Sequence, residues 1–241
     1  MNIVITMAGL GSRFKKAGYQ VPKYQIIAHE KTLFEWSMES LKGFMKDDNQ
    51  YFFVVRVEDQ ASDFIRETCA KLGIHKVQVI QIDYLTKGQA ETAMLCKDLW
   101  EQESKLLIYN IDTYVEAYQM ETSQIQGDGF IPCFLGEGDH WSFVKLDESG
   151  KAVLVKEKER ISEFCTLGAY YFKSCKLYEE LYDSYYTKGN QLEKGERYIA
   201  PLYNYFIRQG GDVRISVVDT DKVHVLGTPE ELDAFVKNYT P

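Results

Sequence analysis

The residues best suited to chemistry lie within the first 23 positions, MNIVITMAGLGSRFKKAGYQVPK. Gly9 and Gly11 follow a short apolar run, and glycines let main-chain N–H groups come close to a phosphate. Arg13 and Lys23 supply the forked guanidinium and the ammonium group that offset the charge of a triphosphate. The spacing matches neither the P-loop nor the G-x-G-x-x-G dinucleotide motif, because Arg13 and Phe14 occupy the place of the third glycine. The pattern therefore predicts a loop that binds phosphate anions.

The pattern MAG-x-GSRF-x-x-x-GY-x-x-PK resembles the signature of the sugar-1-phosphate nucleotidyltransferase-like (NTP transferase) superfamily. It is most similar to a capsule-locus subgroup that includes cytidylyltransferases acting on phosphorylated small molecules. The resemblance implies that Arg13 binds the departing pyrophosphate and that Lys23 stabilises charge at the α-phosphate. It also implies nucleotide contacts along one run of the loop: Met7, Ala8, Gly9, Leu10, Gly11 and Ser12. The alternative is a tight strand-to-helix turn in another kind of α/β protein.

A second segment rich in small residues, YLTKGQAETA, spans residues 84–93. Gly88, Gln89 and Ala90 match the Gly-x-Ala segment that lies beside the nucleotide base in the resembled superfamily. A flat base that is read by main-chain groups requires small neighbours, and Gln89 adds an amide contact. The alternative is an ordinary helix N-terminus with Thr86 as its cap.

A carboxylate follows the apolar strand predicted over residues 105–109, at Asp112. Magnesium prefers one or two carboxylates together with phosphate oxygens and water, so Asp112 is the predicted Mg²⁺ ligand, and an ordinary turn aspartate is the alternative. Many members of the superfamily place a second metal-binding Asp two positions before the glycine that is Gly227 here, where this chain has Val225. The substitutes open from sequence are Asp219, Asp221, His224, Glu196 or water.

An acceptor site is implied by the later half of the chain, where the superfamily carries an E-K pair followed by a G-x-Y-x-F strand. Glu157 and Lys158 match the pair, and GAYYF matches the strand from Gly168. The resemblance places Lys158 at the acceptor phosphate and Trp141, Glu157 and Gly168 in the acceptor pocket. Because KEKER is also typical of a solvated charged face, that interpretation of Lys158 stays open.

Hydrophobic periodicity predicts the elements that position these residues. In the first 82 residues, a strand at 3–5, a helix over 32–45, a strand at 51–57, a helix over 59–72 and a strand at 77–82 indicate a parallel sheet covered on both faces. Ligands of such sheets bind at the carboxyl ends of the strands, where the glycine loop lies.

The rest of the chain alternates strand-like and helical segments. Strands are predicted within 129–146, at 152–156 after a DESGK hairpin, and at 168–172, 213–218 and 223–226. Helices are predicted over 174–186, over 198–208 and from Thr228 onward, and the segment 84–93 is expected to lead into a helix that runs through Leu99. Tyrosine stripes on two of these helices indicate core packing. With the resemblance, the expected fold is α/β: a Rossmann-like nucleotidyltransferase (GT-A-like) fold with a mixed, mostly parallel central sheet flanked by helices and a small β-rich acceptor-binding portion. One domain over 1–241 is expected, with a nucleotide-binding half at 1–128 and an acceptor-binding half at 129–241.

Composition limits the partners. The chain has 241 residues and a net charge of −8, which argues against nucleic acid or an anionic membrane as a partner. Its N-terminal apolar run is too short for a signal peptide, so a cytoplasmic location is expected. The five cysteines form no C-x-x-C pair, which favours buried thiols over a zinc site or disulfides.

The resemblance implies an enzyme, a nucleotidyltransferase that uses Mg²⁺. A phosphorylated acceptor attacks the α-phosphorus of a nucleoside triphosphate and pyrophosphate leaves. CTP is the favoured nucleotide, with UTP or dTTP as alternatives. The acceptor is a sugar 1-phosphate, a phosphocholine-like compound or a phosphorylated amino-acid derivative. The sequence leaves the oligomeric state open, with a homodimer among the alternatives because relatives are often dimers or larger. Two other classes remain: a metal-dependent glycosyltransferase that uses N-I-D as a degenerate D-x-D, and a non-catalytic nucleotide-binding subunit.

Overall fold

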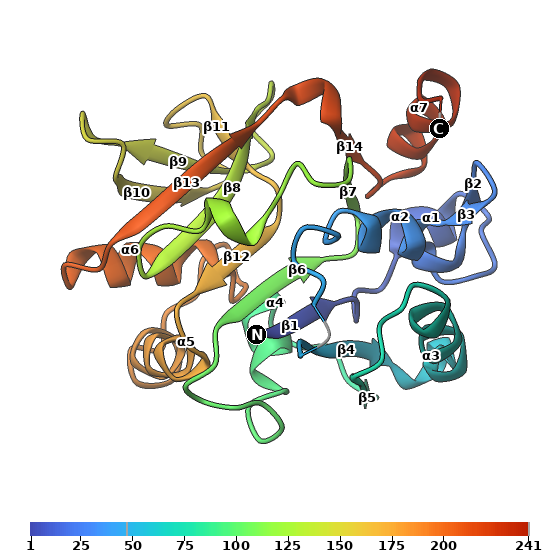
Figure 1. Cartoon of the computed structure of the whole chain (residues 1–241), viewed down its shortest axis with the longest axis horizontal. Helices are drawn as coiled ribbons and strands as arrows, with labels where there is room; N and C mark the ends of the chain where they lie inside the picture. The colour runs from blue at the N-terminus through green and yellow to red at the C-terminus, as the bar shows by residue number, and fades with distance from the viewer. Residues whose placement is uncertain (47, 241) are drawn as a thin grey trace.

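A large mixed sheet forms the centre of the molecule in the computed structural model, which describes residues 1–46 and 48–240 (Figure 1). Within this range ten strands pair in the order β10-β9-β11-β8-β12-β6-β1-β4-β5, with β13 pairing to β8. Their bounds are β1 Asn2–Thr6, β4 Gln50–Arg56, β5 Val77–Ile82, β6 Leu106–Asn110, β8 Gly129–Leu135, β9 Ser142–Leu146, β10 Ala152–Glu157, β11 Phe164–Thr166, β12 Ala169–Phe172 and β13 Val213–Val218. Two small sheets pair β2 Ile27–Ala28 with β3 Lys31–Thr32, and β7 Thr113–Val115 with β14 Val223–Val225.

The N-terminal part of the sheet is parallel. β1 lies between β4 and β6, and β5 extends the sheet beyond β4. In this register Thr6 at the end of β1 lies beside Asn110 at the end of β6. The loop after β1 and the turn after β6 therefore leave the same edge of the sheet as neighbours, which is where open α/β sheets bind their ligands.

Helices cover both faces of the sheet (Figure 1). Their bounds are α1 Ser12–Lys16, α2 Leu33–Glu39, α3 Ser62–Lys71, α4 Gln89–Met94, α5 Cys175–Tyr182, α6 Ala200–Arg208 and α7 Pro229–Asn238, with a π-helical turn at Asp183–Lys188. Val4 packs with residues of α4, α5 and α6, whereas Ile3 and Ile5 pack with α2 and α3. Successive side chains of a strand point to opposite faces, so β1 alone contributes to both cores.

The C-terminal part of the sheet is mainly antiparallel. β12 pairs antiparallel to β6, and β8, β11, β9 and β10 continue the alternation, while β13 runs parallel to β8. The DESGK turn joins β9 to β10 as predicted, because the Asp147 side chain accepts the N–H groups of Ser149 and Lys151. The strand β11 was not predicted, since Phe164–Thr166 is too short to show a periodic pattern.

Two predicted helices are shorter than expected. α2 begins at a capping box between Thr32 and Glu35 and ends at Glu39 rather than at residue 45. The chain leaves the helix and brings Gly43 against Met120, where a Cβ would lie 2.2 Å from the Met120 carbonyl oxygen. α4 ends at Met94 and continues in turns rather than as a helix to Leu99. Hydrophobic spacing persists through these turns, so periodicity alone overstated both lengths.

The tyrosine-rich segments are core, as predicted. Tyr178, Tyr182 and Tyr203 are at most 5% exposed, and burial raises the pKa of the Tyr178 and Tyr203 hydroxyls well above the ordinary value. The five cysteines are free and buried. No helix in the part of the chain that the structure describes is both long and apolar enough to cross a bilayer.

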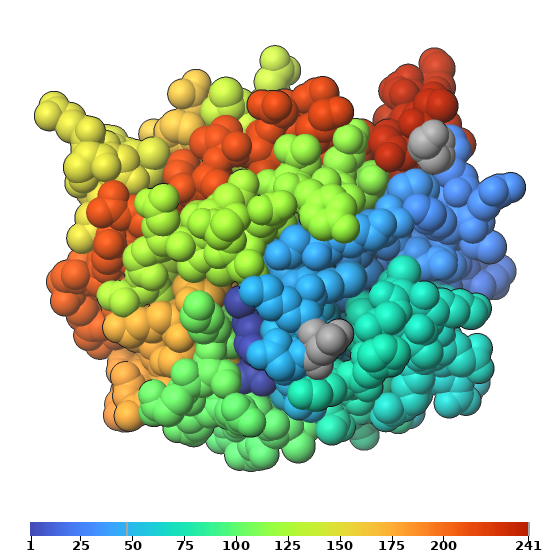
Figure 2. All heavy atoms as spheres, in the orientation of Figure 1, coloured from blue at the N-terminus to red at the C-terminus, as the bar shows by residue number. Residues whose placement is uncertain are grey.

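The C-terminal helix α7 returns to the N-terminal part of the molecule. Figure 2 shows its atoms beside those of the first 40 residues, far from most of the other late segments. Leu232 and Phe235 of α7 pack with Phe14 and Trp36 in a separate small core. Thr228 caps this helix by accepting the N–H of Glu231, as the sequence predicted. Both ends of the chain therefore form the surroundings of the glycine loop.

Candidate active site

The glycine loop after β1 is open to solvent. Gly9, Leu10 and Ser12 are exposed, and a Cβ at Gly9 would meet no atom within 4 Å. Gly11 adopts a φ of +60°, which favours glycine, and it begins α1. Met7 and Ala8 are buried beneath the loop, and the Met7 N–H bonds to the Val54 carbonyl at 3.1 Å, which fixes the start of the loop to the sheet.

Arg13 follows the glycine loop at the start of α1. It is exposed on the first turn of α1, and within residues 1–46 and 48–240 it forms no salt bridge. Its five guanidinium donors are thus available to a ligand.

Lys23 and Asp112 form an ion pair, with Lys23 Nζ 2.6 Å from Asp112 Oδ2. Lys23 lies beside the glycine loop, and Asp112 lies in the turn after β6. Their side chains are 18% and 33% exposed, so the pair is partly shielded from water. The two groups that the resemblance assigned to the α-phosphate and to the metal are therefore adjacent across 89 residues of sequence.

The donors around Asp112 fit magnesium. Asn110 and Asp112 line the same cavity, and Oδ1 of Asn110 is buried without a hydrogen-bond partner among the described residues. Carboxylate and amide oxygens are donors that Mg²⁺ accepts, with substrate phosphates and water completing the octahedron. Within the described residues no group of three or more His, Cys, Asp or Glu side chains could hold a metal ion. Substrate oxygens would therefore be needed to complete the coordination.

Val225 occupies the position at which many members of the superfamily carry a second metal-binding Asp. It lies on β14, opposite Thr113 of β7. Of the substitutes considered, Glu196 lines the cavity that contains Asp112, whereas Asp221 and His224 line a different cavity together with Val225. Glu231 also lies here, although its residue type and spacing gave no reason to expect it from the sequence. A Cβ at Gly227 would lie 3.4 Å from Glu231 Oε2 and 3.7 Å from Asp112 Oδ2, so both carboxylates face that glycine. Glu231 also accepts the Gly227 N–H at 3.0 Å, as a capping residue would.

A cavity of about 340 Å³ extends from Asp112 toward the antiparallel strands. It is lined by residues of both halves of the chain: Gln89, Asn110, Asp112, Thr113, His140, Trp141, Ser142, Glu157, Lys158, Thr166, Leu167, Gly168, Tyr170, Glu196, Tyr198 and Ile199. The structure thus brings Trp141, Glu157, Lys158 and Gly168 together with Gln89 and Asp112. Its volume is suitable for a small polar molecule.

Lys158 is held at the wall of this cavity. Its Nζ donates to the Tyr198 hydroxyl at 2.9 Å and lies 3.9 Å from Glu157 Oε1. The hydrogen bond to Tyr198 raises the pKa of Lys158, so the ammonium form is stabilised. Its main chain has a φ of +53°, a conformation that non-glycine residues seldom adopt outside functional sites and turns.

Glu157 and Trp141 form the neighbouring wall. The Ser142 hydroxyl donates to Glu157, and burial raises the pKa of the Glu157 carboxyl. The Trp141 Nε1–H donates to the Glu137 carbonyl at 2.9 Å, and the ring packs against His140 with centroids 4.3 Å apart. The Trp141 ring is thereby fixed by contacts within the protein.

Gly168 allows a close approach between β12 and the end of β6. It has a φ of +74°, and a Cβ at this position would lie 2.1 Å from Nδ2 of Asn110. Gly168 therefore determines where the Asn110 side chain can lie in the cavity.

The small-residue segment begins α4 beside these groups. Gly88 is the N-cap residue and no side chain caps the helix, so the interpretation of Thr86 as cap is wrong; the Thr86 hydroxyl bonds to that of Thr92 at 2.6 Å instead. Gln89 donates to the Thr6 hydroxyl at 3.2 Å and lines the cavity. Ala90 is fully buried behind the segment.

Tyr198 is a further cavity residue that the sequence did not predict. It falls within the predicted helix over 198–208, but α6 begins at Ala200, and Tyr198 lies before the helix with its hydroxyl accepting from Lys158 Nζ. The signal that could have revealed it is Pro201, because proline favours the first turn of a helix and so moves the helix start beyond Tyr198.

Comparison with protein-family models and with curated proteins gives no match. Solved structures do match. A nucleoside-diphosphate-sugar pyrophosphorylase from Vibrio cholerae RC9 is 34% identical to this protein. The match covers 98% of this chain and 100% of the Vibrio cholerae chain, with a TM-score of 0.89. An inositol-1-phosphate CTP transferase from T. maritima is 14% identical over 100% of this chain and 97% of that chain, with a TM-score of 0.76. A Bacillus anthracis protein assigned as a glucose-1-phosphate thymidylyltransferase, solved with sucrose, is 15% identical over the same shares, with a TM-score of 0.78.

These similarities confirm the predicted α/β class and the Rossmann-like nucleotidyltransferase fold. The two more distant structures support the fold alone. The similarity to the Vibrio cholerae protein covers 98% of this chain and 100% of that chain at 34% identity. The chain belongs to the sugar-1-phosphate nucleotidyltransferase-like superfamily.

Proposed function

We propose that this protein is a Mg²⁺-dependent nucleotidyltransferase that transfers a nucleoside monophosphate from a nucleoside triphosphate to a phosphorylated small molecule and releases pyrophosphate. The observation that carries the proposal is the ion pair of Lys23 and Asp112, in which Lys23 borders the glycine loop and Asp112 borders the 340 Å³ cavity. A triphosphate on the loop and an acceptor in the cavity would meet at this pair. Full-length similarity to the Vibrio cholerae protein supports the same reaction class.

The reaction joins an acceptor phosphate oxygen to the α-phosphorus and breaks the bond from that phosphorus to the oxygen bridging the β-phosphate. The electron pair leaves with pyrophosphate. No side-chain nucleophile is needed, because the attacking phosphate is already ionised, so the protein supplies alignment and countercharge.

The residue roles in this proposal follow from position. Arg13 neutralises the leaving pyrophosphate, Lys23 the charge at the α-phosphate and Lys158 the incoming phosphate. Asp112 would hold Mg²⁺, which would supply Lewis-acid neutralisation of the phosphate oxygens. Lys23 would exchange its contact with Asp112 for a contact with the α-phosphate when the nucleotide binds.

The nucleotide-binding run in this proposal comprises Met7 to Ser12 and Gly88 to Ala90. Gly9 to Ser12 are accessible for direct contacts, while the buried Ala90 shapes the segment from behind. The acceptor-binding residues are Trp141, Glu157 and Gly168. This assigns residues 1–128 mainly to the nucleotide and 129–241 mainly to the acceptor.

CTP is the nucleotide we favour, with UTP and dTTP as alternatives, and synthesis of a capsule or other surface-polysaccharide precursor is the role we favour. The choice of CTP rests on the resemblance of the glycine loop to the capsule-locus subgroup. A sugar 1-phosphate is the first acceptor to test, since the 34% identical structure is described as a nucleoside-diphosphate-sugar pyrophosphorylase.

The test is pyrophosphate release with each NTP, Mg²⁺ and a panel of phosphorylated acceptors. We expect release with one NTP and one acceptor class, and Asp112→Ala to lower turnover by about a hundredfold, as loss of an electrostatic transition-state contact does. Asp98→Ala, which removes an exposed carboxylate outside the cavity, is the control and should keep wild-type turnover. Release of a nucleoside diphosphate would indicate a glycosyltransferase, and nucleotide binding without turnover would indicate a non-catalytic subunit.

A further inference from the structure

The chain turns tightly at residues 193–196 and then runs through residues 196–198 to α6, in contact with the small-residue segment 87–90 and with the cavity that contains Lys158. The side chains of residues 196–198 alternate in direction, as in a strand: Glu196 and Tyr198 line the cavity, while Arg197 between them packs against tyrosines of α5 and the following turn. The nucleotidyltransferase assignment gives Arg197 no role.

The main chain of Arg197 is bonded to the segment 87–90 on both sides of Gly88. The Arg197 N–H donates to the Lys87 carbonyl at 2.6 Å, and the Ala90 N–H donates to the Arg197 carbonyl at 3.0 Å. Gly88 has a φ of +136°, and a Cβ there would lie 2.7 Å from the Arg197 carbonyl oxygen. The segment 87–90 therefore takes its position from Arg197.

The side chain of Arg197 anchors that main chain. Its Nη1 donates to the Tyr182 hydroxyl at 2.5 Å and lies 3.5 Å from Glu91 Oε1. The guanidinium also lies over the ring of Tyr186, 5.7 Å from the centroid, and the side chain is only 16% exposed. Planar stacking and several directed donors are what an arginine provides and a lysine does not.

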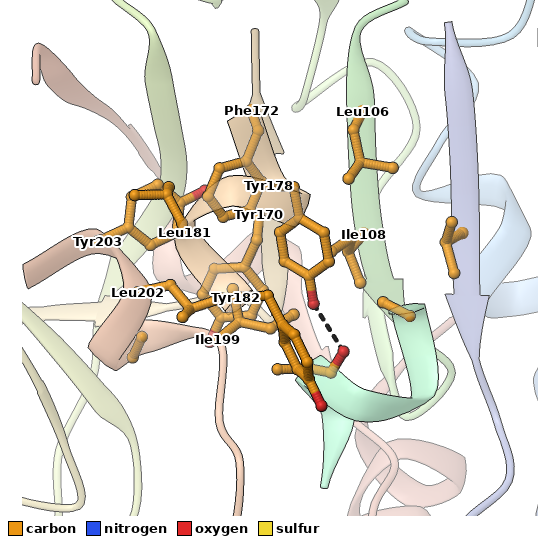
Figure 3. Close-up of a cluster of buried hydrophobic side chains, with 14 of the residues drawn as sticks. Leu106, Ile108, Tyr170, Phe172, Tyr178, Leu181, Tyr182, Ile199, Leu202 and Tyr203 are labelled. Carbon is orange, nitrogen blue, oxygen red and sulfur yellow. Dashed lines mark hydrogen bonds between the residues drawn. The ribbon is translucent and has the colours of Figure 1, made fainter. Parts of the chain in front are cut away.

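Helix α5 also fixes the segment 87–90. The Tyr178 hydroxyl donates to the Ala90 carbonyl at 2.8 Å. Figure 3 shows Tyr178 with Tyr182 beside it and a dashed line from the Tyr178 hydroxyl. Both main-chain groups of Ala90 are therefore bonded inside the protein. Residues 87–90 are therefore bonded to both Tyr178 and Arg197, so their position depends on residues more than 80 positions away in sequence.

We propose that Arg197 is a positioning residue for nucleotide binding: it holds residues 87–90 at the distance at which they contact the base, without itself contacting the nucleotide. The proposal rests on the function proposed above. It separates two parts of nucleotide affinity, since the triphosphate is bound by the glycine loop with Arg13 and Lys23, and only the base depends on Arg197.

The experiment is calorimetric titration of the full chain with CTP, UTP and dTTP, and in parallel with inorganic tripolyphosphate, in the presence of Mg²⁺. For Arg197→Gln we expect about tenfold weaker binding of the preferred nucleotide and unchanged binding of tripolyphosphate. The nucleotide affinity of Arg197→Lys should lie between those of the wild type and Arg197→Gln, because lysine keeps the charge and loses the stacking. A merely structural role would weaken both ligands together. Arg208→Gln, on the exposed last turn of α6, is the matched control.

Equal nucleotide affinity in wild type and Arg197→Gln, or equal losses for nucleotide and tripolyphosphate, would overturn the inference and leave the proposed function standing. Failure of the wild-type protein to bind any of the three nucleotides would overturn both. If Arg197→Gln does not fold, Gly88→Ala replaces it, because the added Cβ displaces the same segment from the other side of the contact. It should show the same selective loss, and an unchanged nucleotide affinity would again contradict the proposal.

Discussion

The glycine loop and the cavity that contains Lys158 differ in how their charged groups are paired. At the loop, Gly9, Leu10 and Arg13 are exposed, and Arg13 makes no ion pair within the described residues. In the cavity, the charged side chains already have partners within the protein. Lys158 is bonded to Tyr198, and Glu157 accepts from Ser142. The loop thus leaves its donors to be satisfied by the ligand, while the cavity wall is preorganised. Binding of a triphosphate should order the loop, whereas an acceptor should meet a wall that changes little.

This difference also separates the effects of mutation. Substitutions in the open loop remove contacts that exist only with the ligand and should lower activity without changing stability. Substitutions in the cavity wall break contacts of the free protein as well, so stability and activity should change together.

The largest expected effect on turnover comes from substitution of Arg13. Arg13→Ala should lower turnover by about a hundredfold, equivalent to about 3 kcal/mol, because the charge of the leaving pyrophosphate loses its cation. The melting temperature should stay that of the wild type, since Arg13 has no ion-pair partner among residues 1–46 and 48–240. Pyrophosphate release and thermal unfolding are the measurements, with Lys16→Ala of the same helix as the control. Turnover close to that of the wild type would show that the open loop does not hold the pyrophosphate.

The next effect concerns Gly168 in the preorganised wall. Gly168→Ala should lower the free energy of unfolding by about 2–3 kcal/mol, because the positive φ disfavours alanine and the Cβ would overlap the Asn110 amide. Gly150, also at positive φ but with no atom within 4 Å of a Cβ, is the matched control and should lose only about 1 kcal/mol. Denaturant unfolding measures both. Equal losses would mean that the contact with Asn110 relaxes freely.

Substitution of Lys158 should have a smaller effect, which is confined to the KM of the acceptor. Lys158→Met should raise the KM of the acceptor about tenfold, the loss of one partly exposed charge-assisted hydrogen bond, and leave the affinity for the nucleotide unchanged. Tyr198→Phe should raise the same KM by less, because it loosens the lysine without removing it. Steady-state kinetics with each substrate varied in turn measure the split. A matching rise in the nucleotide KM would contradict the division between loop and cavity.

The smallest effect is a pH dependence of stability at Glu157. Burial raises the pKa of this carboxyl, so the folded state binds its proton more tightly than the unfolded state does. Its stabilising effect is therefore complete below the unfolded-state pKa and is lost as pH rises through the folded-state pKa. Glu157→Gln, which cannot ionise, should be more stable than the wild type at neutral pH, and the difference should vanish in acid. Urea unfolding across this pH range tests the sign, and a difference that grows in acid would refute it.

Local features of the sequence predicted much of the fold. The bounds of β5 and β13 were predicted to the residue, because apolar runs bounded by turns are readable without knowledge of the partners. The helices predicted over residues 32–45 and through Leu99 were overextended, since their apolar spacing continues in turns that end at tertiary contacts such as that of Gly43 with Met120. The superfamily was identified from the glycine loop because its spacing is local.

The sequence alone determined the glycine loop, the parallel start of the sheet, the cap of the last helix and the strand-end position of Asp112. Only the tertiary structure decided that Lys23 meets Asp112 across 89 residues, that Tyr198 meets Lys158 across 40, and that Arg197 holds the segment around Gly88. The physical reason is the range of the determinants. Capping, turns and periodicity depend on neighbours within one element, whereas these contacts depend on the register of β1 with β6 and on which strands lie side by side.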